Sequence, residues 1–274
     1  MLLKDKKIGF LGGGSMAEAL ITGLLGAGLV EPTSIYASDI NTARQEYLKQ
    51  KFGIQTTDNS AVVNTADIVI LAVKPQAIAG LLEEIAPKVH PELTVISIVA
   101  GIPTDFIESF FSGPVPVVRV MPNTPCLIGQ GASAVCAGKF CPQPNVEKAL
   151  AVFKAAGQAV VVSESMMDCV TGLSGSGPAY MYMIMEGFID GAVRLGLSRD
   201  VARVLTAQTM LGSAKMVLDT GEHPAKLKDM VTTPGGTTIA GLYALEEGAL
   251  RALLMKAVAE AASRSSQLND GKKQ

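Results

Sequence analysis

Short apolar runs alternate with helical stretches from residue 7 to residue 162, and this alternation restricts the possible folds more than any other feature. Strands that alternate with helices build a parallel sheet with helices on both faces. A strand covered on both faces is apolar along its length, as residues 66–73 nearly are. The sequence therefore predicts a mostly parallel α/β sheet, with strands at residues 7–11, 34–38, 54–56, 66–73, 93–99, 115–121, 132–137 and 158–162.

The pattern changes after Ser163, where strand-like runs give way to long stretches rich in alanine, leucine and methionine. Ser198 stands where it could cap the second of these stretches. The boundary falls near residues 163–168, so we expect an α/β domain over 1–164 and an all-helical domain over 165–274. The long helices are predicted at residues 177–195, 198–218, 237–246 and 248–268.

The helical half is unusually apolar for a free-standing bundle. Met181, Met183, Met185 and Phe188 crowd a single stretch, and a helix that is apolar nearly all round is usually buried. Packing within one chain is one way to cover such a surface, and packing against a second copy is the other. Because few residues remain to cover it, we expect the all-α domain to form a homodimer.

Composition and charge exclude several classes of function. The chain has 23 Lys+Arg against 25 Asp+Glu, so the basic face that nucleic acid requires is not expected. A membrane span needs about 20 apolar residues in a row, and no run approaches that length. Residues 4–30 superficially resemble a secretory signal, but Glu18 and the six glycines from Gly9 to Gly26 interrupt them. We expect a cytoplasmic protein without nucleic-acid or membrane partners.

The cysteines and histidines form no recognisable reactive or metal-binding pattern. The four cysteines, Cys126, Cys136, Cys141 and Cys169, include no CxxC pair and have no histidine at ligand spacing. We therefore expect reduced thiols and no metal. Both histidines adjoin prolines in turn-like sequences, so no Ser/His/Asp arrangement is expected. Hydride transfer to an electrophilic imine fits such a chain, because it needs orientation and one weak proton donor.

A glycine-rich loop directly follows the first predicted strand and opens a helix. Residues 12–17 fit the pattern G-x-G-x-x-G/A, which in this context indicates a Rossmann-type dinucleotide site. Gly12 permits the tight turn, Gly14 lets the backbone approach a pyrophosphate, and Ala17 keeps the helix close to the sheet. The helix start adds free N–H groups. A glycine turn without a ligand is the alternative. The expected loop contacts are Gly12, Gly13, Gly14, Ser15 and Met16.

The end of the second predicted strand leaves the choice between NADH and NADPH open. Asp39 lies about 25 residues after the glycines, where an acid can hold the ribose 2′-hydroxyl of NAD. That acid would repel a 2′-phosphate. Ser38, Asn41 and Arg44 could nevertheless bind one, and arginine suits phosphate geometry. Either cofactor is therefore expected.

Lys74 and Asn59 are expected beside the cofactor, because ligands in open α/β sheets sit outside the carboxyl ends of the strands. Ala72, Val73 and Lys74 end the fourth strand, and Pro75 can begin a helix. Lys74 could act as a catalytic acid, as a charge near the phosphates, or as an ordinary solvated lysine.

A second informative stretch runs from Asp229 to Thr238 and contains a Pro-Gly-Gly turn that enters a helix. Such a helix start presents N–H groups that can grip a small carboxylate. The hydroxyls of Thr233, Thr237 and Thr238 add donors. A simple helix cap is the alternative, as it is for the similar loop at residues 173–179.

Five stretches of this chain resemble pyrroline-5-carboxylate reductases, and the resemblance extends over nearly the whole chain. They are residues 12–17, 72–75, 121–125, 171–180 and 223–246. The last two are highly specific, whereas the glycine loop is shared by many dehydrogenases. The resemblance implies the last step of proline synthesis, in which 1-pyrroline-5-carboxylate accepts a hydride from NADPH or NADH at its imine carbon and becomes L-proline.

The resemblance also implies roles for single residues. Thr238 would hydrogen-bond the ring nitrogen and help to deliver the proton, so it is the expected catalytic residue. The backbone of Gly235, Gly236 and Thr237 would hold the carboxylate, and Glu164 would line the substrate pocket. The helical domain would dimerise, the active site would use both subunits, and dimers would assemble into decamers. The positions implied beside the nucleotide are Asn59, Val73, Lys74, Ala100 and Met230.

Two other functions remain open from the sequence. A reductase of another small carboxylated imine or 2-oxo acid would use similar loops, and for a 2-oxo acid Lys215 could serve as the acid. A nucleotide-binding module without catalysis is the second alternative. Substrate comparison separates the first from the leading interpretation, and tight nucleotide binding without turnover would favour the second.

Overall fold

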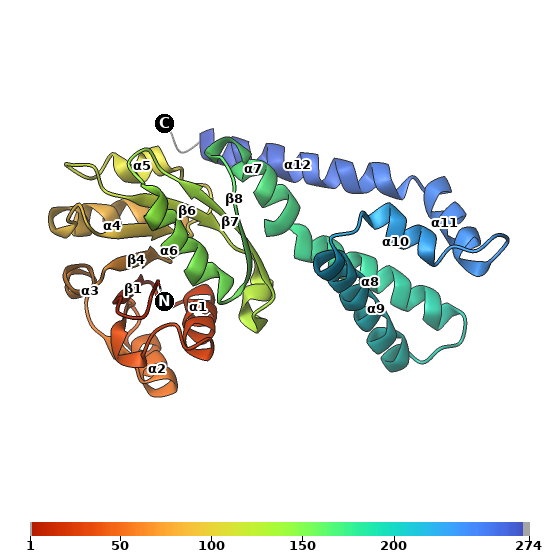
Figure 1. Ribbon diagram of the computed structural model, residues 1–274, viewed down its shortest axis with the longest axis horizontal. Coiled ribbons are helices and arrows are strands. Elements are labelled where there is room, and N and C mark those ends of the chain that lie inside the picture. The colour runs from red at the N-terminus through yellow and green to blue at the C-terminus, as the bar shows by residue number, and fades with distance from the viewer. Residues whose placement is uncertain (1, 271–274) are drawn as a thin grey trace. The chain divides into compact units, whose positions relative to one another are not determined.

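The computed structural model describes residues 2–270, which fall into two compact units (Figure 1). The first unit runs to Ser176 and takes up the chain again at Glu260, and the second is Gly177–Ala259. Helix α12 (Leu250–Asp270) therefore contributes to both units.

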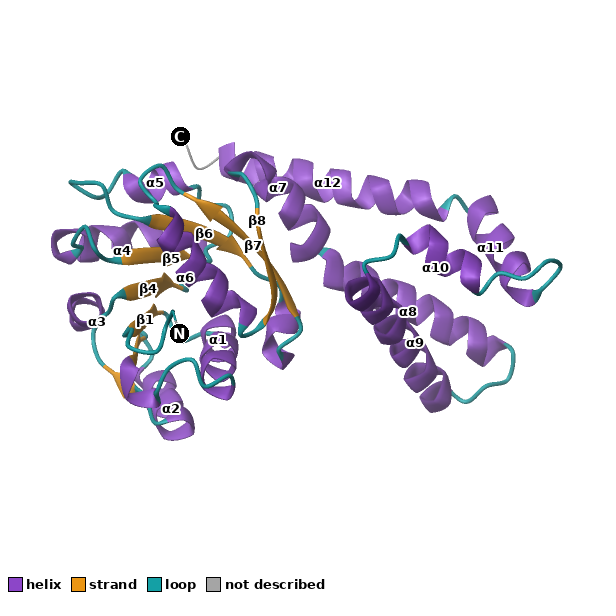
Figure 2. Ribbon diagram, viewed as in Figure 1, coloured by secondary structure: helices purple, strands orange, loops and turns teal. Residues whose placement is uncertain are grey.

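One eight-stranded sheet forms the centre of the first unit (Figure 2). Its order is β3-β2-β1-β4-β5-β6-β7-β8, and β6 and β7 are its one antiparallel pair within the described residues. The predicted strands and the mostly parallel sheet are confirmed. The strands are β1 (Ile8–Leu11), β2 (Ile35–Ser38), β3 (Gln55–Thr56), β4 (Ile68–Leu71), β5 (Thr94–Ser97), β6 (Val117–Met121), β7 (Gly131–Ala137) and β8 (Gly157–Val161).

Helices cover both faces of this sheet, which is why its central strands are apolar throughout. Ile68 and Ile70 of β4 lie in one core cluster with residues of α1 and α6, whereas Val69 and Leu71 lie in a second cluster with residues of α3 and α4. Successive side chains of a strand point to opposite faces, so an alternating pattern would leave one face polar. The helices are α1 (Ser15–Gly26), α2 (Thr42–Phe52), α3 (Asn59–Thr65), α4 (Ile78–Ile85), α5 (Thr104–Glu108), α6 (Gln143–Lys154) and α7 (Met167–Val170).

The strand order reverses direction at β1, and this reversal positions the site. Strand β1 pairs with β2 on one side and with β4 on the other. The connections after β1 and β4 therefore leave toward opposite faces of the sheet, and the carboxyl ends of the two strands flank an open crevice. The Gly12 amide donates to the Ser38 carbonyl at 2.9 Å, and the Ala72 amide donates to the Leu11 carbonyl at 2.8 Å, so the three strand ends are held together.

A buried hydrogen bond ties α6 to the middle of the sheet and allows a stability prediction. The Asn145 side chain donates to the Thr94 hydroxyl at 2.6 Å, and both residues are buried. We expect Asn145→Leu to lower the free energy of unfolding by about 1–3 kcal/mol, because the Thr94 hydroxyl loses its partner in the core. Adding Thr94→Val should recover part of this loss. Urea unfolding of both single variants and the double variant tests the coupling, and strictly additive losses would contradict it.

The second unit is entirely helical, and its four long predicted helices are confirmed. Helix α10 was not predicted, because its seven residues carry little periodicity. The expected cap at Ser198 is wrong in one respect: Ser198 occupies the N-cap position of α9, but its side chain makes no capping hydrogen bond. His223 does cap, since its ring accepts from the Ala225 amide at 3.2 Å. The helices are α8 (Gly177–Arg194), α9 (Arg199–Thr220), α10 (Pro224–Met230), α11 (Thr237–Glu247) and the start of α12.

Large apolar side chains of the second unit remain exposed in the single chain. Met183 and Met255 are about three-quarters exposed, so this unit lacks the cover that such side chains normally have.

No helix within residues 2–270 is long and apolar enough to cross a membrane. The four cysteines are free, and two of them, Cys126 and Cys136, are buried. Among the described residues, no group of three His, Cys, Asp or Glu side chains is placed to hold a metal ion.

Candidate active site

The glycine loop leaves room for a ligand at one position and none at another. Gly12 has φ of 101°, and a Cβ on it would lie 2.6 Å from the Ala72 carbonyl oxygen. A Cβ on Gly14 would meet nothing within 4 Å. Gly14 is the N-cap of α1 and offers no side chain to the first N–H groups of the helix. Open N–H groups beside open space fit the pyrophosphate of a dinucleotide.

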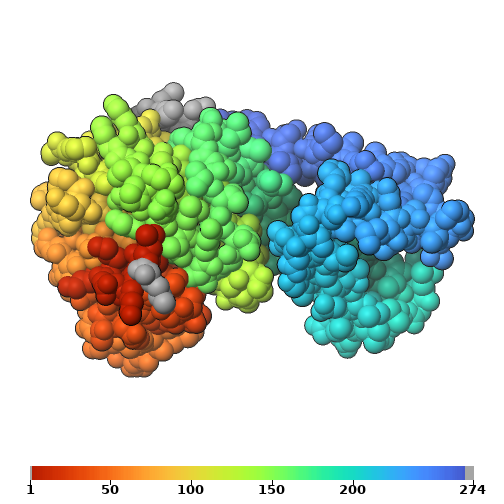
Figure 3. Space-filling model, viewed as in Figure 1, coloured from red at the N-terminus to blue at the C-terminus, as the bar shows by residue number. Residues whose placement is uncertain are grey.

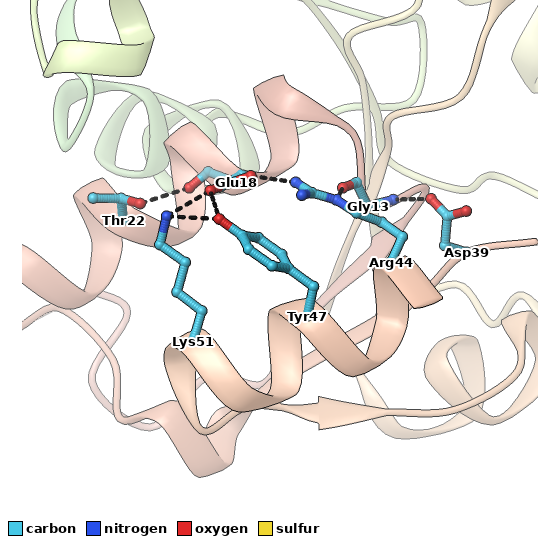
Figure 4. Close-up of polar contacts among 7 residues, drawn as sticks. All are labelled: Gly13, Glu18, Thr22, Asp39, Arg44, Tyr47 and Lys51. Carbon is cyan, nitrogen blue, oxygen red and sulfur yellow. Dashed lines mark hydrogen bonds and ion pairs between the residues drawn. The ribbon is translucent and has the colours of Figure 1, made fainter. Parts of the chain in front are cut away.

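Asp39, which directly follows β2, forms hydrogen bonds that hold this loop in place. Its half-buried carboxylate accepts from the Gly13 amide at 2.8 Å through one oxygen and from the Asn41 amide at 2.8 Å through the other (Figure 4). The predicted position of Asp39 beside the glycines is therefore what the fold produces. Because a carboxylate oxygen has more than one lone pair, Asp39 can still accept from a ribose hydroxyl.

The three residues proposed from sequence to hold a 2′-phosphate all have partners within the protein. Ser38 is 3% exposed, and its hydroxyl donates to the Asn59 side chain at 2.6 Å. The Asn41 side chain caps α2 by accepting from the Ala43 amide at 3.0 Å. The Arg44 guanidinium donates to the Gly13 carbonyl and forms an ion pair with Glu18.

The carboxylate of Glu18 on α1 binds three side chains of α2 (Figure 4). Besides Arg44, its carboxylate accepts from the Lys51 ammonium at 2.7 Å and from the Tyr47 hydroxyl at 2.9 Å. Partial burial on its own would raise the pKa of Glu18. The hydrogen bonds from Lys51, Arg44 and Tyr47 outweigh that effect and lower the pKa to about 2. Glu18 therefore stays ionised at physiological pH. In the sequence alone, Glu18 is recognisable only as a break in an apolar run.

The lowered pKa of Glu18 predicts how stability depends on acidity. The ordinary carboxyl pKa of 4.5 applies to the unfolded chain and about 2 to the folded one, so this contribution is complete above pH 4.5 and disappears as the pH falls through 2. Urea unfolding of the wild type and Glu18→Gln across this range, at one protein concentration, tests it. The stability difference should shrink with acidity, and a constant difference would contradict the prediction.

The remaining residues expected at the nucleotide follow the carboxyl ends of the central strands. Val73 comes within contact of the glycine turn, since its Cγ1 would lie 3.2 Å from a Cβ on Gly12. Asn59 begins α3, and its side chain donates to Glu84 at 2.9 Å besides accepting from Ser38. Lys74 is exposed and forms no ion pair within the described chain. Ser15 and Met16 open α1, Ala72 and Pro75 flank the β4 end, and Ala100 is exposed after β5.

Glu164 belongs to a separate polar cluster beside β6 and β7. Its carboxylate pairs with Arg119 of β6 at 2.5 Å and accepts from the Thr104 hydroxyl at 3.1 Å and the Cys136 thiol at 3.2 Å. Arg119 is 4% exposed. Burial, together with Glu164, raises the pKa of Cys136 to about 12, so this thiol is not a nucleophile at neutral pH. The sequence signal for this cluster was a lone arginine inside an apolar strand.

The start of α11 lies in the second unit and presents the donors that sequence analysis expected. Gly235 has φ of 65°, Gly236 is the N-cap, and the helix begins at Thr237. No side chain caps these N–H groups. Within residues 2–270, the hydroxyls of Thr233, Thr237 and Thr238 also have no hydrogen-bond partner in the chain. The arrangement suits a small carboxylate.

Two further expected residues also belong to the second unit. Met230 ends α10 and lines a shallow apolar pocket together with Met216 and Leu227. Lys215, the alternative acid, is exposed on α9 and pairs with Asp219 at 2.6 Å. Its ammonium is thus held by a neighbour on its own helix.

The parallel sheet, its crevice and the glycine cradle define a dinucleotide-binding oxidoreductase. Family models agree: one described as pyrroline-5-carboxylate reductase dimerisation matches residues 164–268, and one described as NADP oxidoreductase, coenzyme F420-dependent, matches residues 7–101. The pyrroline-5-carboxylate reductase of Methanosarcina acetivorans is 47% identical over 99% of this chain and 100% of its own.

Solved structures lead to the same family. A pyrroline-5-carboxylate reductase from Coxiella burnetii has a TM-score of 0.93 at 37% identity, covering 96% of this chain and 98% of that one. The Plasmodium falciparum enzyme, crystallised with NADP bound, has a TM-score of 0.84 at 31% identity, covering 97% and 99%. The chain belongs to the pyrroline-5-carboxylate reductase family. It is an NAD(P)-dependent oxidoreductase of that activity with a C-terminal dimerisation domain, so the predicted fold class, enzyme class and homodimer are confirmed.

Proposed function

We propose that this reductase converts 1-pyrroline-5-carboxylate into L-proline, the last step of proline synthesis, with NADPH or NADH as the reductant. The observation that carries the proposal is the likeness to reductases of this substrate over 99% of the chain. The site geometry is consistent with it, because the chain offers a dinucleotide cradle and a donor-rich helix start.

The nucleotide site is proposed to use the glycine loop and the neighbouring strand ends. The first N–H groups of α1 would face the pyrophosphate, and Asp39 would accept from the adenosine ribose. When bound, NAD(P)H supplies a hydride to the imine carbon of the substrate. The proposed cofactor-binding residues are those predicted from sequence: Gly12, Gly13, Gly14, Ser15, Met16, Ser38, Asp39, Arg44, Asn59, Ala72, Val73, Lys74, Pro75, Ala100 and Met230.

The substrate site is proposed at the start of α11. The N–H groups of residues 235–237 would hold the carboxylate, helped by the helix dipole and the nearby hydroxyl of Thr233. The Thr238 hydroxyl would hydrogen-bond the ring nitrogen, which gains a proton as the adjacent carbon gains the hydride. The support is that the hydroxyls of Thr233 and Thr238 have no partner within the described chain, whereas the Gly236 amide donates to the Thr233 carbonyl at 3.1 Å. Thr238 is half-buried at the second helical position.

Glu164 is proposed to line the substrate pocket from a fixed position. The contacts with Arg119, Thr104 and Cys136 use both of its carboxylate oxygens, while about a third of the side chain remains exposed. A charge held in this way can orient a ligand without moving. The alternative acid Lys215 is not assigned a role, because Asp219 already neutralises it.

Dimers are proposed to assemble further, into a larger oligomer such as a decamer, with active sites that use both subunits. The exposed apolar side chains of the second unit support an extensive interface. We also propose domains over residues 1–164 and 165–274, since the dimerisation family begins at residue 164. A cytoplasmic location stays a prediction, supported by the four free cysteines.

Turnover measurements test the proposed reaction. The purified protein should consume NADH or NADPH in the presence of 1-pyrroline-5-carboxylate and release proline in equal amount. Small 2-oxo acids, assayed in parallel, should give far slower turnover. Nucleotide binding without turnover of the pyrroline would contradict the proposal and favour a binding module.

A further inference from the structure

The cations nearest the ribose end of the nucleotide site are already neutralised. Arg44 and Lys51 both bind the carboxylate of Glu18, and Lys51 also donates to the Tyr47 hydroxyl at 3.0 Å (Figure 4). The Arg44 guanidinium lies over the Tyr47 ring at 4.7 Å and donates to the Gly13 carbonyl. In the space-filling view, the early segments that carry these residues, drawn red and orange, form one continuous surface (Figure 3).

NADPH differs from NADH by a phosphate on the 2′-oxygen of the adenosine ribose. In this kind of fold that oxygen lies at the end of β2, where an acidic residue favours the hydroxyl and a free arginine favours the phosphate. The acid here is Asp39, and the next residue, Ile40, is fully exposed and apolar. Glu18 pairs with two of the three cations on α2, and the Asp39 carboxylate accepts from the Gly13 and Asn41 amides.

We propose that Glu18 is a positioning residue that sets the nucleotide preference: by holding Arg44 and Lys51, it denies the 2′-position a free cation, and the enzyme favours NADH over NADPH. The inference rests on the proposed use of NAD(P)H. The lowered pKa of Glu18 means that this restraint persists at every physiological pH. Ser38 and Asn41 cannot replace the arginine readily, because their side chains already serve Asn59 and the α2 cap.

The contacts of Glu18 matter more for the positive charge available to a 2′-phosphate than for the stability of the fold. Ion pairs near the surface contribute only modestly to stability, Lys51 keeps nearly half of its side chain exposed, and a glutamine at position 18 keeps the capacity to accept hydrogen bonds. Removing the charge of Glu18 should therefore leave the protein folded. The freed guanidinium and ammonium would then face a 2′-phosphate with an added positive charge, and charges a few ångströms apart near a surface interact strongly enough to change affinity severalfold.

Glu18→Gln tests the proposal, because glutamine keeps the shape and removes the charge. We expect the ratio of kcat/KM with NADPH to that with NADH to rise roughly tenfold, chiefly through KM, and the gain to shrink at high salt. The matched control is Glu46→Gln on α2, the helix that carries Arg44 and Lys51. Glu46 is exposed and accepts from Gln50 rather than from a cation, so this variant loses the same charge without freeing Arg44. Its ratio should stay unchanged.

A second variant identifies the cation, and a direct titration separates the two proposals. Glu18→Gln combined with Arg44→Gln should lose most of the gain seen in Glu18→Gln alone. Titration of NADH and NADPH without substrate should show tighter NADH binding by the wild type. An unchanged ratio in Glu18→Gln, or tighter NADPH binding by the wild type, would overturn the inference while leaving the proposed reaction intact. Failure to turn over the pyrroline would instead overturn the reaction, whatever the titration shows.

Discussion

We expect Gly14→Ala to weaken the binding of both NADH and NADPH by about two orders of magnitude while the protein stays folded. The reason is the open space beside this residue: a Cβ would touch nothing in the chain and would occupy the place where the pyrophosphate approaches the backbone. Its φ of −65° suits any residue. An alanine at this N-cap should cost at most about 1 kcal/mol of stability.

Gly12→Ala is the matched comparison, because it should lower the stability of the protein, whereas Gly14→Ala should lower nucleotide affinity. Its positive φ and the clash of a Cβ with the Ala72 carbonyl should lower the free energy of unfolding by about 1–3 kcal/mol. Fluorescence titration with NADH and urea unfolding of both variants measure the two quantities separately. Normal nucleotide affinity in folded Gly14→Ala would contradict the assignment of the cradle.

The second large effect is expected at Thr238. Thr238→Val keeps the shape of the side chain and removes the hydroxyl, so kcat should fall about 100-fold if this hydroxyl delivers the proton. The fold should not suffer, because within the described chain this hydroxyl has no partner to lose. Thr238→Ser, which keeps a hydroxyl, should retain most of the activity.

Steady-state kinetics with saturating nucleotide distinguish the proposed roles of the α11 start. Loss of a proton donor lowers kcat, whereas loss of a carboxylate contact raises KM. Thr233→Val, which removes the hydroxyl proposed to help hold the carboxylate, should therefore affect mainly KM for the substrate. If Thr238→Val kept the kcat of the wild type, the proton would have to come from another group, and the proposed catalytic role would be wrong.

Local features of the sequence were sufficient for the elements and for the cradle. Strand β4 is apolar on both faces, and α8 is apolar along most of its length, and such patterns depend on neighbouring residues alone. The glycine loop is recognisable for the same reason, since its turn and its helix start occupy six consecutive residues, 12–17. Helix α10 was missed because a seven-residue segment has too few turns to show a period.

Ion pairs between residues far apart in the sequence are not indicated by any local pattern. Glu18 and Arg44 are 26 residues apart, and Arg119 and Glu164 are 45 apart. Arg44 lies beside the glycine loop, where it donates to the Gly13 carbonyl, and its ion pair with Glu18 depends on how α1 and α2 pack side by side. No periodicity encodes that packing, because many charged residues of either sign lie on exposed helix faces.

The sequence by itself determined the order and kind of the secondary elements, the dinucleotide loop and the family, because these follow from hydrophobic periodicity and from contiguous motifs. Only the tertiary structure decided which ionised groups are free and which are neutralised. That outcome depends on distances of a few ångströms between side chains brought together by the sheet, and electrostatic interactions change steeply over such distances.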